Sequence, residues 1–224
     1  MVSQSFRTSL IKEEKKMEFY DVVKSRRTIR DFSDKKVDKK IIEKILSAGL
    51  MAPTNDHLRD WEFVVILDKE IIGNIIKPIP KTISEKRVDF IIDSWKVNAP
   101  FQKEAYKDAI PKQHQMLIQS GCLILPFFKQ HSPLLKPKNL SSLNSFASIW
   151  CCMENIMLAA TAEGLGVSMR IPFEKETENI FEILKHPKEY IMPCFLSIGY
   201  PLSKINAPKQ QKQKIKEKIH YNKW

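Results

Sequence analysis

The feature that most constrains the fold is a long apolar segment between residues 142 and 163. Its apolar side chains recur at steps of three and four residues, the period of an α-helix; they are Phe146, Ile149, Trp150, Met153, Ile156, Met157 and Ala160. The apolar face is so wide that the helix must be buried on most sides, either at the centre of a domain or across a dimer interface. Gly164-Leu165-Gly166 follows and ends the helix, because glycine readily adopts the left-handed geometry of a C-cap.

Shorter helices and strands alternate around this segment. The patterns predict helices at 17–25, 38–51 and 174–184, and strands at 61–67, 122–128, 167–171 and 195–200. Asp38 is the expected N-cap of the second helix, and Pro126 predicts that the second strand ends there or lies at an edge. Residues 69–119 have a helical pattern interrupted by prolines, which indicates a variable insert or a substrate lid. The alternation favours one α+β domain, with a central mixed sheet covered by helices on both faces.

The two ends of the chain are polar and basic. Residues 1–16 have no apolar core, so we interpret them as a flexible extension and not as a secretory signal, and we expect a cytoplasmic protein. No apolar run approaches the roughly 20 residues of a membrane span. The formal charge of +11 comes partly from lysines within 204–224. That tail lacks the interleaved aromatic residues of a single-strand-binding surface, so nucleic acid is not the favoured partner; an anionic cofactor or protein explains the charge equally well.

The sequence contains no recognisable motif for catalysis by side chains alone. The sequence contains no GxSxG, HExxH, P-loop or GxGxxG pattern, and its histidines lack the spacing of metal ligands. Cys122, Cys151, Cys152 and Cys194 form no CxxC pair and lie in apolar runs, so we expect them to be buried free thiols and expect no metal site. An enzyme with this sequence would therefore depend on a cofactor for its chemistry.

A basic segment near the start of the chain is the main candidate binding element. Residues 24–32 contain Arg26, Arg27 and Arg30 together with the hydroxyl groups of Ser25 and Thr28. Several charge-assisted donors at such close spacing suit a phosphate, or a flat ring with acceptors on its edge. By itself, this segment is also compatible with a solvated basic turn.

Separated sequence blocks then resemble the nitroreductase family of FMN-dependent oxidoreductases. The blocks are Ser25-Arg26-Arg27-Thr28-Ile29-Arg30, Ala52-Pro53-Thr54, Trp61-Glu62-Phe63-Val64-Val65, Glu154 to Gly166, and Ser197-Ile198-Gly199-Tyr200-Pro201. The resemblance covers residues 17–224, except for part of 70–120. It implies a nitroreductase-like three-layer α-β-α sandwich, and a homodimer with FMN at the subunit interface. Residues 201–224 would be a basic tail that reaches the partner subunit.

The resemblance also implies roles for individual residues. Arg26, Thr28 and Arg30 match positions that contact the phosphate, ribityl and pyrimidine groups of FMN, with Arg27 between them. Arg26 is the candidate for the phosphate. Arg30 is the candidate cation beside flavin N1, where it would stabilise the charge that builds on reduction. The further implied cofactor-binding residues are Pro53, Thr54 and Asn55 from the partner, His57, the turn and strand residues Gly164, Leu165, Gly166, Met169 and Ile171, and Lys212 in the tail.

One loop departs from the family pattern. The family commonly has Ala-Pro-Ser-x-x-Asn-x-Gln-Pro-Trp, whereas this chain has His57 in the asparagine position, and Arg59 and Asp60 in the glutamine and proline positions. The resemblance implies a ping-pong reductase that takes hydride from NADH or NADPH and reduces a nitroaromatic, a quinone or a similar acceptor, with no catalytic side chain. The unusual loop leaves dehalogenation or flavin fragmentation open. FMN storage or sensing, and nucleic-acid binding through the tail, are further alternatives.

Overall fold

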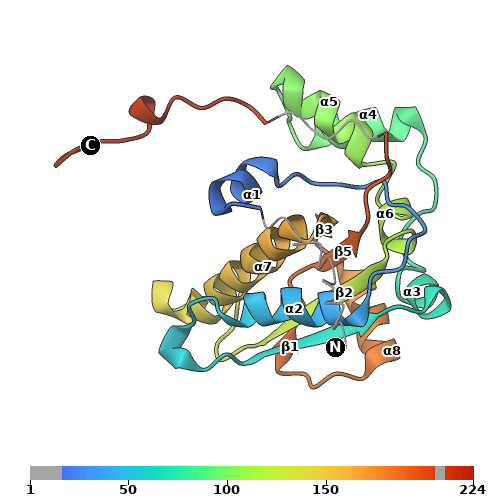
Figure 1. Cartoon of the computed structure of the whole chain (residues 1–224), viewed down its shortest axis with the longest axis horizontal. Coiled ribbons are helices and arrows are strands. Elements are labelled where there is room, and N and C mark those ends of the chain that lie inside the picture. The colour runs from blue at the N-terminus through green and yellow to red at the C-terminus, as the bar shows by residue number, and fades with distance from the viewer. Residues whose placement is uncertain (1–16, 205–209) are drawn as a thin grey trace, which may run out of the picture.

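The computed structural model describes residues 17–204 and 210–224 of the chain (Figure 1). The helices are α1 (Phe19–Ser25), α2 (Lys39–Leu50), α3 (Lys69–Ile75), α4 (Glu85–Ser94), α5 (Pro100–Ala109), α6 (Gln115–Ile118), α7 (Asn144–Ala162) and α8 (Glu174–Leu184). The short 3-10 helices are η1 (Asn55–His57), η2 (Leu140–Leu143) and η3 (Ile215–Glu217). The strands are β1 (Trp61–Ile66), β2 (Cys122–Lys129), β3 (Gly166–Arg170), β4 (Tyr190–Ile191) and β5 (Phe195–Gly199). The predicted helices and strands are thus present, with ends displaced by a residue or two.

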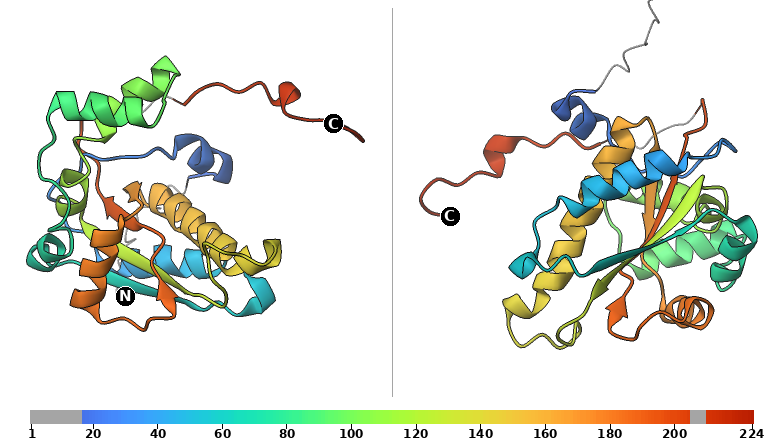
Figure 2. Two further views of the ribbon diagram at one scale, coloured as in Figure 1. Left: turned by 180° about the vertical axis from the view of Figure 1, so that it is seen from behind. Right: turned by 60° about the horizontal axis from the view of Figure 1, so that its bottom comes forward.

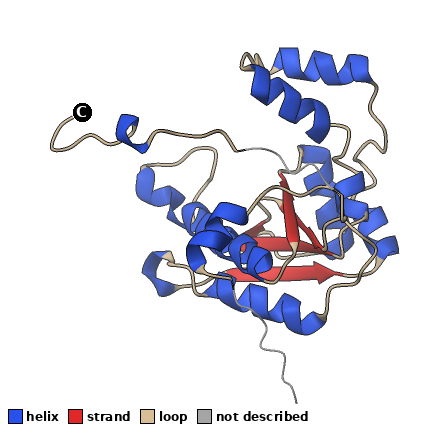
Figure 3. Cartoon of the chain, turned by 45° about the horizontal axis from the view of Figure 1, so that its top comes forward, coloured by secondary structure: helices blue, strands red, loops and turns tan. Residues whose placement is uncertain are grey.

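The strands form one sheet, drawn in red in Figure 3. Its order is β1-β2-β5-β3, and β4 pairs with the far end of β2. These named strands pair antiparallel to one another. A parallel bridge joins Thr28 to Val167 of β3, so the basic segment extends the sheet at this edge. The combination of helices with this sheet confirms the predicted α+β class.

Helices cover both faces of the sheet (Figure 2). On one face, α2 and α7 bury the first apolar core against β2 and β5. On the other face, α3, α6 and α8 enclose a second core. Asp38 caps α2 as predicted, its carboxylate accepting from the Lys40 N–H at 2.7 Å. Gly49 lets α2 approach α7 closely, because a Cβ there would lie 2.6 Å from Cγ1 of Ile156.

The helices α4 and α5 form a hairpin apart from these layers (Figure 1). Val88, Ile92 and Ile110 give the hairpin a small apolar cluster of its own. Pro100 does not interrupt a helix but begins α5, where its missing N–H costs no helical hydrogen bond.

Pro126 does not end the second strand, because β2 continues to Lys129. The Lys129 N–H donates to Asp60 beside β1, and the Gln130 N–H donates to Glu189 on the opposite side. Backbone nitrogens point to alternate sides along a strand, so the nitrogen of Pro126 faces the same side as that of Gln130. On this side, β5 pairs only with Cys122 to Ile124, and β4 pairs only with Phe128 and Lys129. The strand therefore passes through the proline at a point where its missing donor breaks no hydrogen bond of the ladder.

The prediction that all four cysteines are buried is wrong for Cys151. Cys122, Cys152 and Cys194 are buried, whereas Cys151 is exposed on α7. Successive residues of an α-helix point about 100° apart, so Cys151 and Cys152 cannot both face the core. Burial raises the pKa of the Cys122 and Cys152 thiols to about 12, which makes these groups inert at neutral pH.

Two features of the described residues bear on the class of protein. In residues 17–204 and 210–224, no helix combines the length and apolarity of a membrane span. The same residues contain no group of three or more His, Cys, Asp or Glu side chains placed to hold a metal ion. The predicted extension at 1–16 lies outside the described residues. The end of the tail, 210–224, is exposed and extends away from the sheet (Figure 1).

Candidate cofactor site

The basic segment lies directly beside the strand that follows the glycine turn. After α1 ends at Ser25, the chain runs extended past β3, and the Ile29 N–H donates to the Val167 carbonyl at 2.9 Å. Gly166 makes this approach possible, because a Cβ there would lie 2.7 Å from the Cβ of Ile29. The structure thus brings together two of the predicted elements, Arg26–Arg30 and Gly164–Ile171.

Two of the three guanidinium groups in this segment keep free hydrogen-bonding capacity. Arg26 Nε lies 3.8 Å from a Glu154 oxygen, and Arg30 Nη1 lies 3.8 Å from Asp108 Oδ2. These distances exceed those of hydrogen bonds, and neither group donates one to another described residue. Arg27 instead folds back and donates to the carbonyls of Lys24 and Arg26 at 2.6 and 2.7 Å. Arg26 and Arg30 are therefore the available cations.

Arg30 is also withdrawn from water. Burial lowers the pKa of its guanidinium, although the neighbouring carboxylates of Asp108 and Asp31 act in the opposite direction. An arginine remains charged in spite of such a shift. A half-buried cation of this kind interacts strongly with an acceptor placed against it, because the local dielectric constant is lower than that of bulk water.

Apolar side chains are exposed on β3 and just beyond it. Met169 is 38% exposed, Ile171 63% and Phe173 67%. Gly164 has a φ of +72° with open space around it, so the turn is accessible. A ligand with an apolar planar ring and anionic or acceptor-rich ends would match this combination of exposed apolar groups and free cations. FMN has that chemistry, so the residues present fit the cofactor that the sequence implies.

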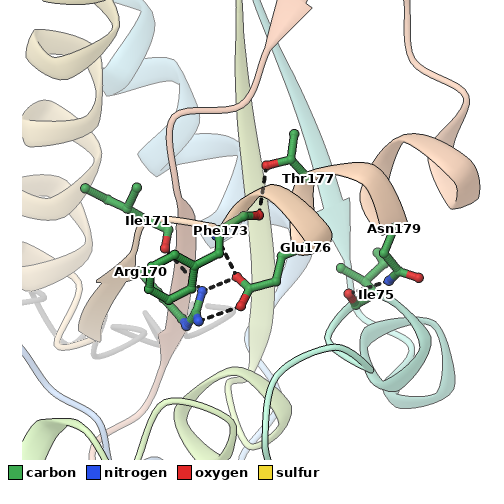
Figure 4. A network of polar contacts seen from close by, with 7 residues as sticks. All are labelled: Ile75, Arg170, Ile171, Phe173, Glu176, Thr177 and Asn179. Carbon is green, nitrogen blue, oxygen red and sulfur yellow. Dashed lines mark hydrogen bonds and ion pairs between the residues drawn. The ribbon is translucent and has the colours of Figure 1, made fainter. Parts of the chain in front are cut away.

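A buried ion pair fixes the end of this strand (Figure 4). The guanidinium of Arg170 makes two hydrogen bonds to the carboxylate of Glu176, one of them 2.7 Å long. Glu176 also accepts from the Phe173 N–H at 3.1 Å, so strand, turn and first turn of α8 are joined. Sequence reasoning missed this pair, because each residue alone looks like an ordinary surface charge. It holds the backbone that carries Met169 and Ile171.

The predicted loop at 53–57 lies beside the first residues of α7. The Asn55 N–H donates to Ser148 Oγ at 3.1 Å, and the Asn144 amide donates to Asn55 Oδ1 at 3.1 Å. Asn144 begins α7, whereas Arg26 lies beside Glu154, which is ten residues, or about 15 Å, further along the helix. Among the described residues of one chain, no hydrogen bond or ion pair joins Pro53, Thr54, Asn55 or His57 to Arg26 or Arg30.

The loop is strained as well as distant. Asp56, His57 and Arg59 have φ values of 50°, 56° and 50°, a region that non-glycine residues rarely occupy. Asp60 pairs with His131 across 3.2 Å. Such backbone outliers often occur at functional sites. No sequence motif signalled this geometry; only the departure from the family pattern pointed to the loop.

The predicted tail residue Lys212 is exposed, in the part of the tail that leaves the domain. Its predicted contact with a phosphate stays a prediction, because the chain alone does not place it beside Arg26.

Comparisons with known proteins identify the class. The sequence profile of the nitroreductase family matches residues 23–200. The chain therefore belongs to the nitroreductase family.

Individual relatives are distant but cover most of the chain. A protein of Methanothermobacter thermautotrophicus named "Putative NADH dehydrogenase/NAD(P)H nitroreductase" is 24% identical over 93% of this chain and 89% of its own length. Iodotyrosine deiodinase of Nematostella vectensis is 21% identical over 92% of this chain and 75% of its own. A crystal structure of oxidized iodotyrosine deiodinase bound to FMN and 3-iodo-L-tyrosine superposes with a TM-score of 0.70, at 19% identity, covering 92% of this chain and all of that one. This likeness confirms the nitroreductase-like fold.

Proposed function

We propose that the protein is an FMN-dependent oxidoreductase that oxidises NADH or NADPH and reduces an electron-poor acceptor. The observation that carries the proposal is the pair of available guanidinium groups, Arg26 and Arg30, on the segment that pairs with β3, the strand that carries Met169 and leads to Ile171. Membership of the nitroreductase family and the FMN-bound deiodinase of the same fold support the choice of cofactor.

In this proposal, the chain's residues bind and orient the cofactor. FMN would supply the two-electron redox chemistry between the nicotinamide and a nitroaromatic, quinone or related acceptor. Arg26 binds the phosphate, and Arg30 faces the pyrimidine edge and stabilises the negative charge of the reduced state. Met169 and Ile171, held by the Arg170–Glu176 pair, cover the ring. Protons come from solvent, so no side-chain acid is required.

The site is completed by a second copy of the chain. The partner's copy of the loop at 53–57 and its tail with Lys212 would supply the remaining contacts. Support comes from large apolar side chains that the single chain leaves exposed near α7: Phe19 at 63%, Tyr20 at 83% and Met51 at 77%. Exposed groups of this size on neighbouring helices are typical of a surface that is buried on association.

A second candidate keeps the cofactor and changes the reaction to reductive dehalogenation. It is favoured by the similarity to iodotyrosine deiodinases and by the altered loop, where Arg59 and Asp60 replace an amide and a proline. The arginine segment would bind FMN equally well for both reactions, so the two candidates are distinguished by which acceptor the protein reduces.

The test uses the full chain, purified and supplied with FMN. We expect a yellow protein whose visible absorbance is bleached anaerobically by NADH or NADPH and restored by a nitroaromatic or a quinone. Restoration by a halogenated phenol with release of halide, and not by nitro or quinone compounds, would select the second candidate. A protein that is colourless once the unbound FMN has been removed would contradict both candidates.

A further inference from the structure

Four charged side chains connect the hairpin helix α5 to the basic segment. Arg30 Nη1 lies 3.8 Å from Asp108 Oδ2, near the end of α5. Lys112 Nζ lies 2.8 Å from Asp108 Oδ1 and 2.7 Å from Asp31 Oδ2. The network therefore has two cations and two carboxylates, contributed by the basic segment and by the chain at the end of α5.

Three of the four side chains in this network are sheltered from solvent, which strengthens the influence of their charges on one another. The side chains of Arg30, Asp31 and Lys112 are 19%, 24% and 28% exposed, whereas that of Asp108 is 49% exposed. Burial alone would lower the pKa of Lys112, but hydrogen bonding and charge attraction to Asp108 and Asp31 together outweigh that effect and raise it. Charges at such sites are screened less by solvent and salt than those of fully exposed pairs.

Asp108 divides its two oxygens between the cations. One oxygen accepts a hydrogen bond from Lys112, and the other faces Arg30 without reaching hydrogen-bond distance. Arg30 is thus attracted toward α5 while its donors stay available for another acceptor. An aspartate that formed a close two-point bond with Arg30 would instead have occupied those donors.

We propose that Asp108 is a positioning residue, which orients Arg30 toward the flavin and offsets part of its charge, and that Lys112 in turn limits this offset. The inference rests on the proposed function and names a determinant of the same site outside the family's sequence blocks. The α4–α5 hairpin thereby affects the relative affinities for oxidised and reduced FMN, although Asp108 itself touches Arg30 and not the cofactor.

The signs of two substitutions follow. Reduced FMN carries more negative charge than oxidised FMN, so removing the carboxylate in Asp108→Asn favours the reduced form. Removing the cation in Lys112→Gln strengthens the influence of Asp108 and disfavours the reduced form. Two changes on the same network should therefore shift the cofactor in opposite directions.

The hairpin offers a matched control for each change. Asp89 of α4 and Lys107 of α5 form a separate pair at 3.1 Å, more than half exposed on both sides. Asp89→Asn and Lys107→Gln make the same charge changes in the same hairpin without touching Arg30. Asp108→Glu keeps the charge and should keep the wild-type behaviour.

The experiment measures the midpoint potential of FMN bound to the full chain, by anaerobic spectroscopic titration. For Asp108→Asn, we expect the ratio of reduced to oxidised affinity to rise about tenfold, equivalent to about 30 mV for a two-electron couple. For Lys112→Gln, we expect a shift of opposite sign, about threefold. The two controls should stay close to wild type, and urea unfolding shows which variants are folded.

Each outcome decides the matter. Opposite shifts at Asp108 and Lys112 with small shifts in the controls would establish the inference. Unchanged potentials in both variants, or equal shifts in the controls, would overturn it while leaving FMN binding intact. If Asp108→Asn fails to fold, the midpoint potential of Lys112→Gln is compared with that of Lys107→Gln, and a shift in the first variant alone supports the inference. A wild-type chain that binds no FMN would overturn the proposed function, and this inference with it.

Discussion

The basic segment and the loop at 53–57 were both predicted to bind FMN, yet the structure holds them differently. The basic segment joins the edge of the sheet through backbone pairing at Thr28 and Ile29. The loop is tied by side chains to the start of α7, and three residues within 56–59 have positive φ. One chain therefore holds the two predicted elements at separate positions along α7, and in the proposed function a second copy would bring unlike elements together.

The difference also separates rigidity from adaptability. Backbone pairing and the close approach at Gly166 leave the basic segment little freedom. The loop depends on hydrogen bonds to Ser148 and Asn144, which a small rearrangement could exchange. We expect the basic segment to make the FMN contacts that are common to the family, and the loop to influence which acceptor is reduced.

The largest expected effect concerns the anchor of β3, the strand beside the basic segment. Glu176→Gln removes the charge partner of Arg170 in a pair whose side chains are 8% and 5% exposed. Breaking a buried ion pair from one side costs about 3–5 kcal/mol, because the remaining charge is uncompensated. Urea unfolding should show that loss, together with weaker FMN binding. A loss comparable to that of the surface variant Glu217→Gln, which leaves Lys214 unpaired, would contradict the anchoring role.

The next effect concerns the contact between the basic segment and β3. Gly166→Ala places a methyl group 2.7 Å from the Cβ of Ile29, which cannot move without the backbone. We expect a loss of about 1–3 kcal/mol from overpacking and a displaced arginine segment. The control is Gly73→Ala within α3, where the nearest atom to the added Cβ is 4.0 Å away. There the higher helix propensity of alanine should raise the free energy of unfolding by roughly 0.5–1 kcal/mol. Equal FMN affinity in both variants would argue against this contact as a determinant of the site.

The two available arginines should each contribute to cofactor affinity. Replacing Arg26 or Arg30 by Gln removes charge-assisted hydrogen bonds worth about 1.5–3 kcal/mol, which corresponds to a Kd for FMN that is roughly ten- to a hundredfold higher. Quenching of flavin fluorescence measures it. Arg87→Gln, a surface change on α4 beside Phe90, serves as the control. A Kd for Arg30→Gln that matches this control would remove Arg30 from the site.

The smallest expected effect is a change in labelling of Cys151. This thiol is exposed in the single chain, whereas Cys152 is buried and its pKa is raised to about 12. If α7 is a dimer-core helix, Cys151 should react slowly with a maleimide at protein concentrations that favour the dimer, and faster on dilution. Mass spectrometry locates the label. Rapid labelling at every concentration would place the interface elsewhere.

Much of the fold could be predicted because it depends on local patterns. The apolar period of α7, the Asp38 cap and the β-rich run at Trp61 each determine an element within a short stretch of sequence. Long-range electrostatic contacts could not be predicted in that way. Neither the Arg170–Glu176 pair nor the Arg30–Asp108 contact has a signal in its own segment, since partners are chosen only after the sheet and the hairpin have packed.

The candidate site shows the same limit. Residue types indicated the arginines and the glycine turn, and the structure brought these together because both flank one strand. The exposed position of Cys151 was predicted wrongly, and β2 does not end at Pro126 but passes through it where one side of the strand is unpaired. Each outcome depends on which face or neighbour the finished fold provides. The positive φ values of Asp56, His57 and Arg59 are likewise not revealed by composition alone.

The most direct test of a site shared between two copies of the chain is a mixing experiment with two inactive variants. One variant carries Arg26→Gln and Arg30→Gln, and the other carries Pro53→Trp, a bulky change at an exposed position of the loop. In a mixed dimer one site receives both defects and the other receives neither, so unfolding and refolding the variants together should restore about a quarter of the wild-type FMN sites. Measured FMN content near that fraction is the predicted result. A mixture that binds no more FMN than the two variants kept apart would contradict a site shared between two copies of the chain.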